Sequence, residues 1–272
     1  MKSIRLLFLL FITWPHFGLG QEDDKPLDIV VEESKDSINF LALNHRLYPQ
    51  TVALQIMTKG VEAPALPDYF VVPPGAKPIK LFAIAIPKGK AWSYRYGYRL
   101  SMGNVEAKHN DEIVYQLPFP QGTTYMLSQG YNGKVSHQNI NALDFTMEEG
   151  DTITAARDGI VVRVKANESR GCPAPRCAEF ANYVTVLHDD DTMAEYVHFK
   201  QNGVLVAVGE QVMAGTPIGL AGATGQASGP HLHFIVYSQN SETQINFQTK
   251  FRISETEVSF LTEGNRYTAH YN

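Results

Sequence analysis

The chain has 272 residues, enough for one large domain or two modest ones, and 44% of them are hydrophobic against 19% charged. This balance predicts a packed core and excludes an intrinsically disordered chain. The net charge of −5, without a long basic run, argues against nucleic acid as the main partner.

The N-terminus has the pattern of a secretory signal peptide. Lys2 and Arg5 precede an apolar run at residues 6–12, and small residues follow, ending at Gly20. The apolar run is too short to span a bilayer, so cleavage after Gly20 is expected to release a protein without a membrane anchor. The sequence therefore predicts a signal peptide over residues 1–20 and a secreted, periplasmic protein, with a buried N-terminal helix as the alternative.

The next part of the chain reads as strands and turns. Residues 21–27 are acidic and polar and are expected to form a linker. Beyond them the alternating apolar sets are Val52, Leu54 and Ile56; Phe82, Ile84 and Ile86; and Tyr94, Tyr96, Tyr98 and Leu100. Short strands at this spacing predict a β-sandwich of unknown role over residues 28–117. The tyrosine set is interpreted as a core face, with carbohydrate contact as the alternative. His45 and His109 are interpreted as isolated surface or turn residues.

The second half is also strand-rich. The stretch "LPFPQG", at residues 117–122, reads as a domain junction. Strands are predicted at residues 160–164, 183–187, 194–199 and 231–237, and the tail is expected to pair back through "FRIS" and "VSFL". The glycine-rich stretch before the last strand lacks a following Lys-Ser/Thr, so tight turns are favoured over a phosphate-binding loop. The fold class is therefore all-β, with a second domain over residues 118–272.

The chain has two cysteines, Cys172 and Cys177, in "CPAPRC". An oxidising compartment favours a disulfide between them. Pro173 and Pro175 suit a tight loop better than a regular element. Two free thiols and half a metal site are the alternatives.

The hexapeptide "GPHLHF" places His231 and His233 at the start of a predicted strand. Side chains of a strand alternate between faces, so both imidazoles point the same way, roughly 6.5–7 Å apart along the chain. Two imidazoles on one face can bind a metal together, or one can bind it while the other moves protons. Two polar residues on a solvated face are the alternative.

Three further candidates precede this strand: His137 and Asp144 in "SHQNINALDF" and His198 in "YVHF". Taken singly they are interpreted as a turn residue, a strand-end cap and a core histidine. Taken together with the pair in "GPHLHF", they fit a catalytic zinc site, which takes three protein ligands from His and carboxylate and leaves room for water. Asp158 and His188 are interpreted as structural, and the acidic run 189–191 as a solvated hairpin tip.

The motifs "SHQNINALDF", "YVHF", "GEQVMAGTPIGLAGATG" and "GPHLHF" follow one another in an order typical of one family. From residue 126 to 237 the chain resembles the M23 zinc metallopeptidases, the lysostaphin and LytM-like peptidoglycan endopeptidases. Two features depart from the family pattern. The spacing from His137 to Asp144 is longer than the common three intervening residues, and "GDTI" at residues 150–153 stands where "Gly-Thr-Pro-Val" is usual.

The resemblance implies that His137, Asp144 and His233 ligate Zn²⁺, and that His198 and His231 are catalytic without being ligands. It further implies a LytM-like antiparallel β-sheet domain that hydrolyses peptide cross-links of bacterial peptidoglycan through a zinc-activated water. The alternatives are a catalytically inactive cell-wall-binding or hydrolase-activating protein of the same fold, and a metal-binding or structural β-protein.

Overall fold

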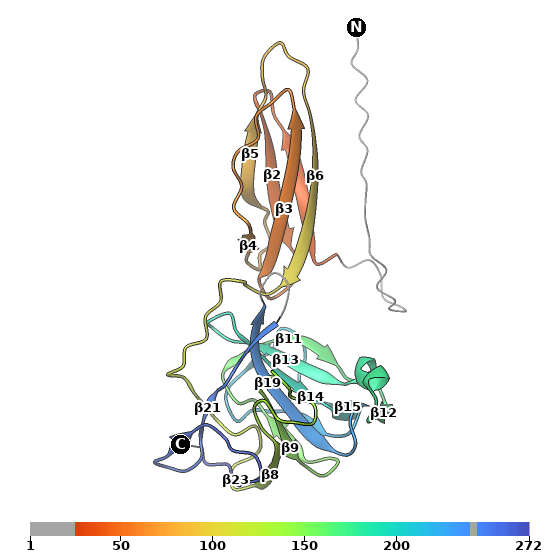
Figure 1. Ribbon diagram of the computed structural model, residues 1–272, viewed down its shortest axis with the longest axis vertical. Helices are drawn as coiled ribbons and strands as arrows, with labels where there is room; N and C mark the ends of the chain where they lie inside the picture. The colour runs from red at the N-terminus through yellow and green to blue at the C-terminus, as the bar shows by residue number, and fades with distance from the viewer. Residues whose placement is uncertain (1–24, 240–243, 272) are drawn as a thin grey trace.

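The computed structural model describes residues 25–239 and 244–271, which are almost entirely β-strands and turns (Figure 1). Within these ranges the one helix is η1 (Pro175–Phe180), a short 3-10 helix. No helix in the described part of the chain has the length and apolar character needed to cross a bilayer. The predicted all-β fold class is confirmed. The expected signal peptide and most of the expected linker lie outside the described residues.

The N-terminal strands form two three-stranded antiparallel sheets, ordered β1-β2-β5 and β4-β3-β6. Their strands are β1 (Leu27–Glu33), β2 (Ser37–Asn44), β3 (Gln50–Lys59), β4 (Phe70–Val72), β5 (Ile79–Ala85) and β6 (Ser93–Met102). Every second side chain of β2 is buried, which gives its sheet one apolar face. From this face Phe40 stacks on Phe82 with ring centroids 4.4 Å apart and meets Tyr94 and Tyr96 edge-on. One cluster of buried side chains therefore joins the two sheets.

The tyrosine run of β6 divides between this core and the surface. Tyr94 and Tyr96 pack against the buried cluster, as the core-face interpretation predicts. Tyr98 is exposed.

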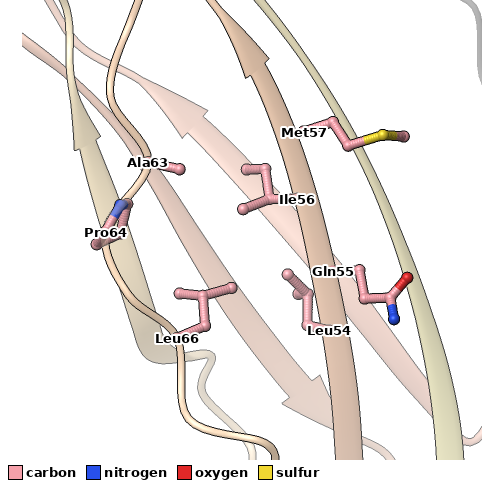
Figure 2. Close-up of a pocket in the computed structure, with 7 residues that line it drawn as sticks. All are labelled: Leu54, Gln55, Ile56, Met57, Ala63, Pro64 and Leu66. Carbon is pink, nitrogen blue, oxygen red and sulfur yellow. The ribbon is translucent and has the colours of Figure 1, made fainter.

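A shallow recess lies beside β3 on the same part of the molecule. Figure 2 shows Leu54 and Ile56 of β3 facing Leu66 and the chain at Ala63 and Pro64. None of the lining side chains titrates, so the recess offers apolar contact and no acid–base chemistry.

The second half is built on a nine-stranded sheet, ordered β16-β11-β13-β14-β19-β9-β8-β23, with β20 also paired to β19. Its strands are β8 (Thr124–Gln129), β9 (Ala142–Thr146), β11 (Gly159–Lys165), β13 (Tyr183–Leu187), β14 (Met193–Val197), β16 (Gln211–Val212), β19 (His231–Gln239), β20 (Gln244–Phe247) and β23 (Arg266–Thr268). The strands predicted at 160–164, 183–187 and 231–237 are confirmed. The strand expected at 194–199 is interrupted, because His198 adopts a left-handed backbone with φ of 73°.

Three small sheets complete this half, ordered β10-β17-β15, β12-β18 and β22-β21-β7. Their strands are β7 (Val114–Tyr115), β10 (Thr152–Thr154), β12 (Gly171–Cys172), β15 (Phe199–Val204), β17 (Pro217–Ala221), β18 (Gly225–Gln226), β21 (Lys250–Arg252) and β22 (Val258–Ser259). The tail does pair back as predicted, since β21 pairs with β22 and, in parallel, with β7. Tyr115 and Leu117, which precede the expected boundary after residue 117, pack in the main buried cluster of this second half.

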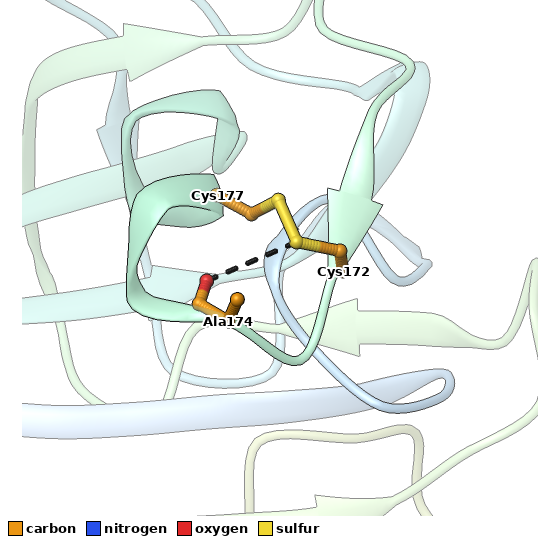
Figure 3. Close-up of a disulfide and its surroundings, with 3 residues drawn as sticks. All are labelled: Cys172, Ala174 and Cys177. Atoms are coloured by element: carbon orange, nitrogen blue, oxygen red, sulfur yellow. Dashed lines mark hydrogen bonds between the residues drawn. A yellow bond between two sulfur atoms is a disulfide. The ribbon is translucent and has the colours of Figure 1, made fainter.

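Cys172 and Cys177 are joined by a disulfide (Figure 3). The alternatives of two free thiols and half a metal site therefore do not describe this structure. The expected irregular loop is wrong in one respect: η1 occupies part of it. Pro175 stands at the start of η1, where its missing N–H costs no hydrogen bond.

A smaller buried cluster connects the two halves of the molecule. Tyr48, in the turn before β3, packs in one cluster with Ile235 and Tyr237 of β19. Just after β6, the side-chain amide of Asn104 donates to Asp191 Oδ2 at 2.8 Å. The N-terminal sheets therefore rest against β19, the strand that begins with two of the candidate histidines.

Candidate metal centre

Three candidate ligands meet where β9 and β19 lie side by side in the large sheet (Figure 1). His233 and Asp144 are direct partners in this antiparallel pairing, so their side chains lie on the same face. Asp144 Oδ1 lies 2.8 Å from His233 Nδ1 and 3.3 Å from His137 Nε2. One potential ligand atom from each residue lies within 4.8 Å of the others, so the group can hold a single metal ion.

The hydrogen bonds of His137 fit this role. The residue is 1% exposed, and its Nδ1 donates to the Gly130 carbonyl at 3.1 Å. That bond assigns the proton to Nδ1 and leaves an unprotonated Nε2. Nε2 is buried and has no hydrogen-bond partner. A buried polar atom without a partner is costly, and a metal ion shared with Asp144 and His233 would satisfy it.

The long spacing between His137 and Asp144 is absorbed by a turn. The N–H of Ile140 donates to the His137 carbonyl at 2.9 Å. Asn139 within this turn has a φ of 60°, a left-handed conformation that asparagine tolerates well. The extra residues therefore loop out ahead of β9, and His137 still reaches Asp144.

Gln129 is a site residue that the sequence reasoning missed. It lies at the end of β8, opposite Asp144, and its side-chain amide donates to Asp144 Oδ2 at 2.8 Å. Its Oε1 accepts from the backbone N–H groups of Val135 and Ser136 at 3.0 and 2.9 Å. Gln129 thus orients the carboxylate, with Oδ1 toward the two histidines, and also fixes the loop that carries His137.

We expect Gln129→Leu to weaken metal binding by about 10- to 100-fold, the usual effect of removing a group that orients a metal ligand. The measurement is metal affinity by competition with a chromogenic chelator. Gln138→Leu is the matched control, because Gln138 is exposed and bonds only to the Lys134 carbonyl among the hydrogen bonds of the described residues. Equal affinities for the two variants would show that Gln129 does not support the ligand.

The electrostatics of the group favour an ionised carboxylate. Burial by itself raises the pKa of Asp144, but the adjacent imidazoles of His137 and His233 outweigh it and hold that pKa well below the usual range. Burial lowers the pKa of His137, and the adjacent Asp144 carboxylate more than reverses this, so that the net pKa is raised. A bound cation would take the place of the protons that the carboxylate otherwise attracts.

His198 and His231 lie together beside this group. Their ring centroids are 4.4 Å apart, and His231 Nε2 is 4.0 Å from Asp144 Oδ1. Both rings donate Nδ1–H to a backbone carbonyl, His198 to Thr224 at 2.6 Å and His231 to Gly229 at 2.9 Å. In the neutral state each ring therefore presents an unprotonated Nε2. Burial, and then the neighbouring charge of His231, lowers the pKa of His198 to about 3.

Three other histidines of the described residues, His45, His109 and His188, do not belong to this group. His188 is buried and donates Nδ1–H to the Asp158 carbonyl at 2.7 Å, which fits the structural interpretation of both residues. His45 is exposed and contacts Asp28 at 2.9 Å. The prediction that His109 is a surface residue is wrong: its side chain is 2% exposed and stacks on Phe247 with centroids 5.0 Å apart, because the tail folds over it.

The acidic run 189–191 forms the tip of the hairpin between β13 and β14, but it is only partly solvated. The Arg157 guanidinium, which is itself buried, bonds to Asp189 and lies 2.9 Å from Asp190 Oδ2. The predicted solvated tip is therefore wrong for Asp190. A buried guanidinium requires a charged partner, and this carboxylate supplies it.

His188 should make the protein less stable in acid. Burial, followed by the charge of Arg157, lowers its pKa to about 4 from an unfolded value of 6.5. The unfolded chain therefore takes up the proton first. The contribution of the neutral ring is fully present above about pH 6.5 and is lost as the pH falls toward 4, amounting to about 2 kcal/mol between pH 7.5 and 5. Denaturant unfolding of chelator-treated wild type and His188→Gln at both pH values checks this, and equal acid slopes would contradict it.

Known proteins match the part of the chain that holds Asp144, His198 and the pair His231 and His233. Residues 138–246 match the model of Peptidase family M23, so the resemblance seen in the sequence is confirmed. The chain is 31% identical over 127 residues to an uncharacterized metalloprotease of Buchnera aphidicola, covering 44% of this chain and 31% of that protein. It is 35% identical over 94 residues to the peptidoglycan DD-endopeptidase ShyA of Vibrio cholerae, covering 35% of this chain and 19% of that protein. It thus spans less than a third of the length of these curated relatives.

Among solved structures, the catalytic domain of the antimicrobial peptidase lysostaphin from Staphylococcus simulans is similar to this chain at 23% identity. The similarity covers 46% of this chain and 87% of that one, with a TM-score of 0.32.

Proposed function

We propose that the part of the chain around residues 138–246, which match the model of Peptidase family M23, is a zinc endopeptidase that hydrolyses peptide cross-links of bacterial peptidoglycan. The observation that carries the proposal is the group of His137, Asp144 and His233 with a second pair of histidines in contact beside it. A structural metal site is closed by four protein ligands, whereas a catalytic zinc site has three. Similarity to peptidoglycan DD-endopeptidases supports the choice of substrate.

The proposed zinc ligands are His137 Nε2, a carboxylate oxygen of Asp144 and His233 Nδ1. Two imidazole nitrogens and one carboxylate suit zinc, while magnesium and calcium prefer sets made of oxygen. When bound, zinc supplies a Lewis acid that polarises a carbonyl and lowers the pKa of a bound water toward about 7.

His198 and His231 are proposed to transfer protons and stabilise charge without binding the metal. Each ring is fixed by its Nδ1–H bond to a carbonyl, so chemistry takes place at Nε2. A ring whose Nε2 is bare accepts a proton from the attacking water. A ring whose Nε2 carries a proton donates to the developing oxyanion or to the leaving amine. Two rings in contact can therefore supply one base and one acid, since their mutual repulsion opposes a charge on both.

We also propose the organisation of the whole chain: a signal peptide at 1–20, a linker that ends before β1, a β-sandwich of the strands β1 to β6, and a peptidase domain whose buried cluster already includes Tyr115 and Leu117, in a secreted, periplasmic protein. Separate buried clusters in the two sets of strands support the division into domains. The disulfide supports an oxidising compartment.

The function is tested by incubating purified, zinc-loaded protein with purified peptidoglycan sacculi. We expect release of soluble muropeptides, loss of release with a chelator, and recovery with added zinc. Mass spectrometry of the products identifies the bond. If sacculi of several cross-link chemistries release nothing but the protein sediments with them, the inactive cell-wall-binding alternative is correct instead.

A further inference from the structure

The segment of residues 171–180 is attached to β18 through its backbone. The short strand β12 pairs in parallel with β18. The N–H of Gly225 donates to the Arg170 carbonyl at 2.9 Å, and the N–H of Ala227 donates to the Cys172 carbonyl at 3.1 Å. These bonds fix the backbone on the C-terminal side of Thr224.

Close packing leaves little room for movement between the segment 171–180 and residues 223–225. A Cβ atom added to Gly171 would lie 1.8 Å from the Ala223 carbonyl oxygen. One added to Gly225 would lie 2.5 Å from the Cβ of Ala181, and Gly225 also has a φ of 83°. Glycine is therefore required on both sides of the contact, because any other residue would force the segment away from residues 223–225.

Thr224, between these contacts, holds His198. Its carbonyl accepts the His198 Nδ1–H at 2.6 Å, and its hydroxyl donates to the Phe199 carbonyl at 2.7 Å. The N–H of His198 donates to the Asn182 carbonyl at 2.9 Å, and the N–H of Asn182 donates to Thr224 Oγ1 at 3.0 Å. His198 needs this support because its φ of 73° is unfavourable for a residue other than glycine.

The disulfide closes the segment 171–180, which packs against the residues that hold His198. Figure 3 shows Cys172 at the end of β12 bonded to Cys177 in η1. No residue of 171–180 belongs to the main buried cluster of this half. Its position therefore depends on the backbone bonds to residues 225–227, on the bond that Lys165 of β11 donates to the Glu179 carbonyl, and on the link to η1, rather than on side chains buried in the main cluster.

We propose that the disulfide-closed segment 171–180 positions the His198 imidazole for catalysis, acting through the carbonyl of Thr224. The proposal rests on the peptidase function, in which His198 Nε2 handles a proton. Cys172 and Cys177 are thus positioning residues. Displacing a reacting group by about 1 Å can cost roughly 100-fold in rate. Opening the disulfide should therefore lower kcat by roughly 10- to 100-fold. Zinc content and KM should change little, since the ligands lie on β9, β19 and the loop before β9.

The experiment compares the full chain, wild type against the Cys172→Ser/Cys177→Ser variant. Arg176→Ala is the matched control, because Arg176 is an exposed residue of the same segment. Three quantities are measured on each sample: zinc content, kcat and KM for sacculus hydrolysis, and the His198 Nδ1–H resonance in a histidine-labelled NMR spectrum. We expect the double-serine variant alone to lose kcat, and its His198 Nδ1–H signal to broaden through faster exchange with solvent.

The same disulfide variant made in His198→Ala protein distinguishes an effect on the position of His198 from a general loss of stability. In His198→Ala protein, removing the disulfide should cause no further loss of kcat, because the group on which it acts is gone. An equal additional loss in that background would overturn the proposal, as would an unchanged His198 signal in the double-serine variant. If that variant does not fold, Thr224→Val, which removes the hydroxyl bonds and keeps the carbonyl, must reproduce the loss of kcat and the broadened signal. If wild type proves inactive on peptidoglycan, the NMR comparison still decides whether the segment holds His198.

Discussion

His233→Ala is expected to abolish metal binding and hydrolysis together. The substitution removes Nδ1, which lies 2.8 Å from Asp144 Oδ1, and leaves two protein ligands where a catalytic zinc site requires three. Zinc content should fall from about one per chain to background. Loss of the metal removes several kcal/mol of transition-state stabilisation, so hydrolysis should fall by about 10³-fold or more. Elemental analysis by mass spectrometry and muropeptide release measure the two effects on the same samples.

His45→Ala is the control, since His45 is an exposed histidine of the N-terminal sheets. It should keep both zinc and activity. Circular dichroism shows whether either variant has lost the β-fold. A folded His233→Ala protein with full zinc would show that this residue is not a ligand, and the assignment of the whole group would have to be revised.

The strand that carries the site could be predicted because its signals are local. The Gly229-Pro230 break and the apolar run after it define the start of β19, and the period of two places His231 and His233 on one face. The partner strand contributes Asp144 through a register that no local pattern specifies. From the sequence, only the resemblance to a family predicted that Asp144 lies beside the histidines of β19.

The residues that the sequence missed act through contacts between distant segments. Gln129 orients Asp144 because a register shift in β8 brings it opposite that carboxylate, and a single glutamine has no periodic signature. His109 was expected at the surface because its burial depends on Phe247, more than a hundred residues later. The left-handed backbone of His198 was missed for a related reason: the strand pattern around it is regular, and the hydrogen bonds that His198 donates to the carbonyls of Thr224 and Asn182 impose the exception.

His231→Ala and His198→Ala are expected to keep the metal and lose catalysis. Neither residue belongs to the three-residue group that can hold a metal, so zinc content should match that of wild type. His231 Nε2 faces the site 4.0 Å from Asp144 Oδ1, and removing a general acid–base group at such a position costs roughly 10²- to 10⁴-fold in rate. His198→Ala should likewise cost roughly 10²- to 10⁴-fold, because it removes the second acid–base group beside the metal site.

The two losses should not add. The rings are in contact at 4.4 Å and share the work of one base and one acid, so either substitution alone leaves the other ring without its partner. The double variant should therefore be only slightly slower than the slower single variant. Muropeptide release, with zinc measured on the same samples, checks all three proteins against wild type. Full activity in either single variant would remove that histidine from the mechanism, and full additivity in the double variant would show that the two rings act independently at separate steps.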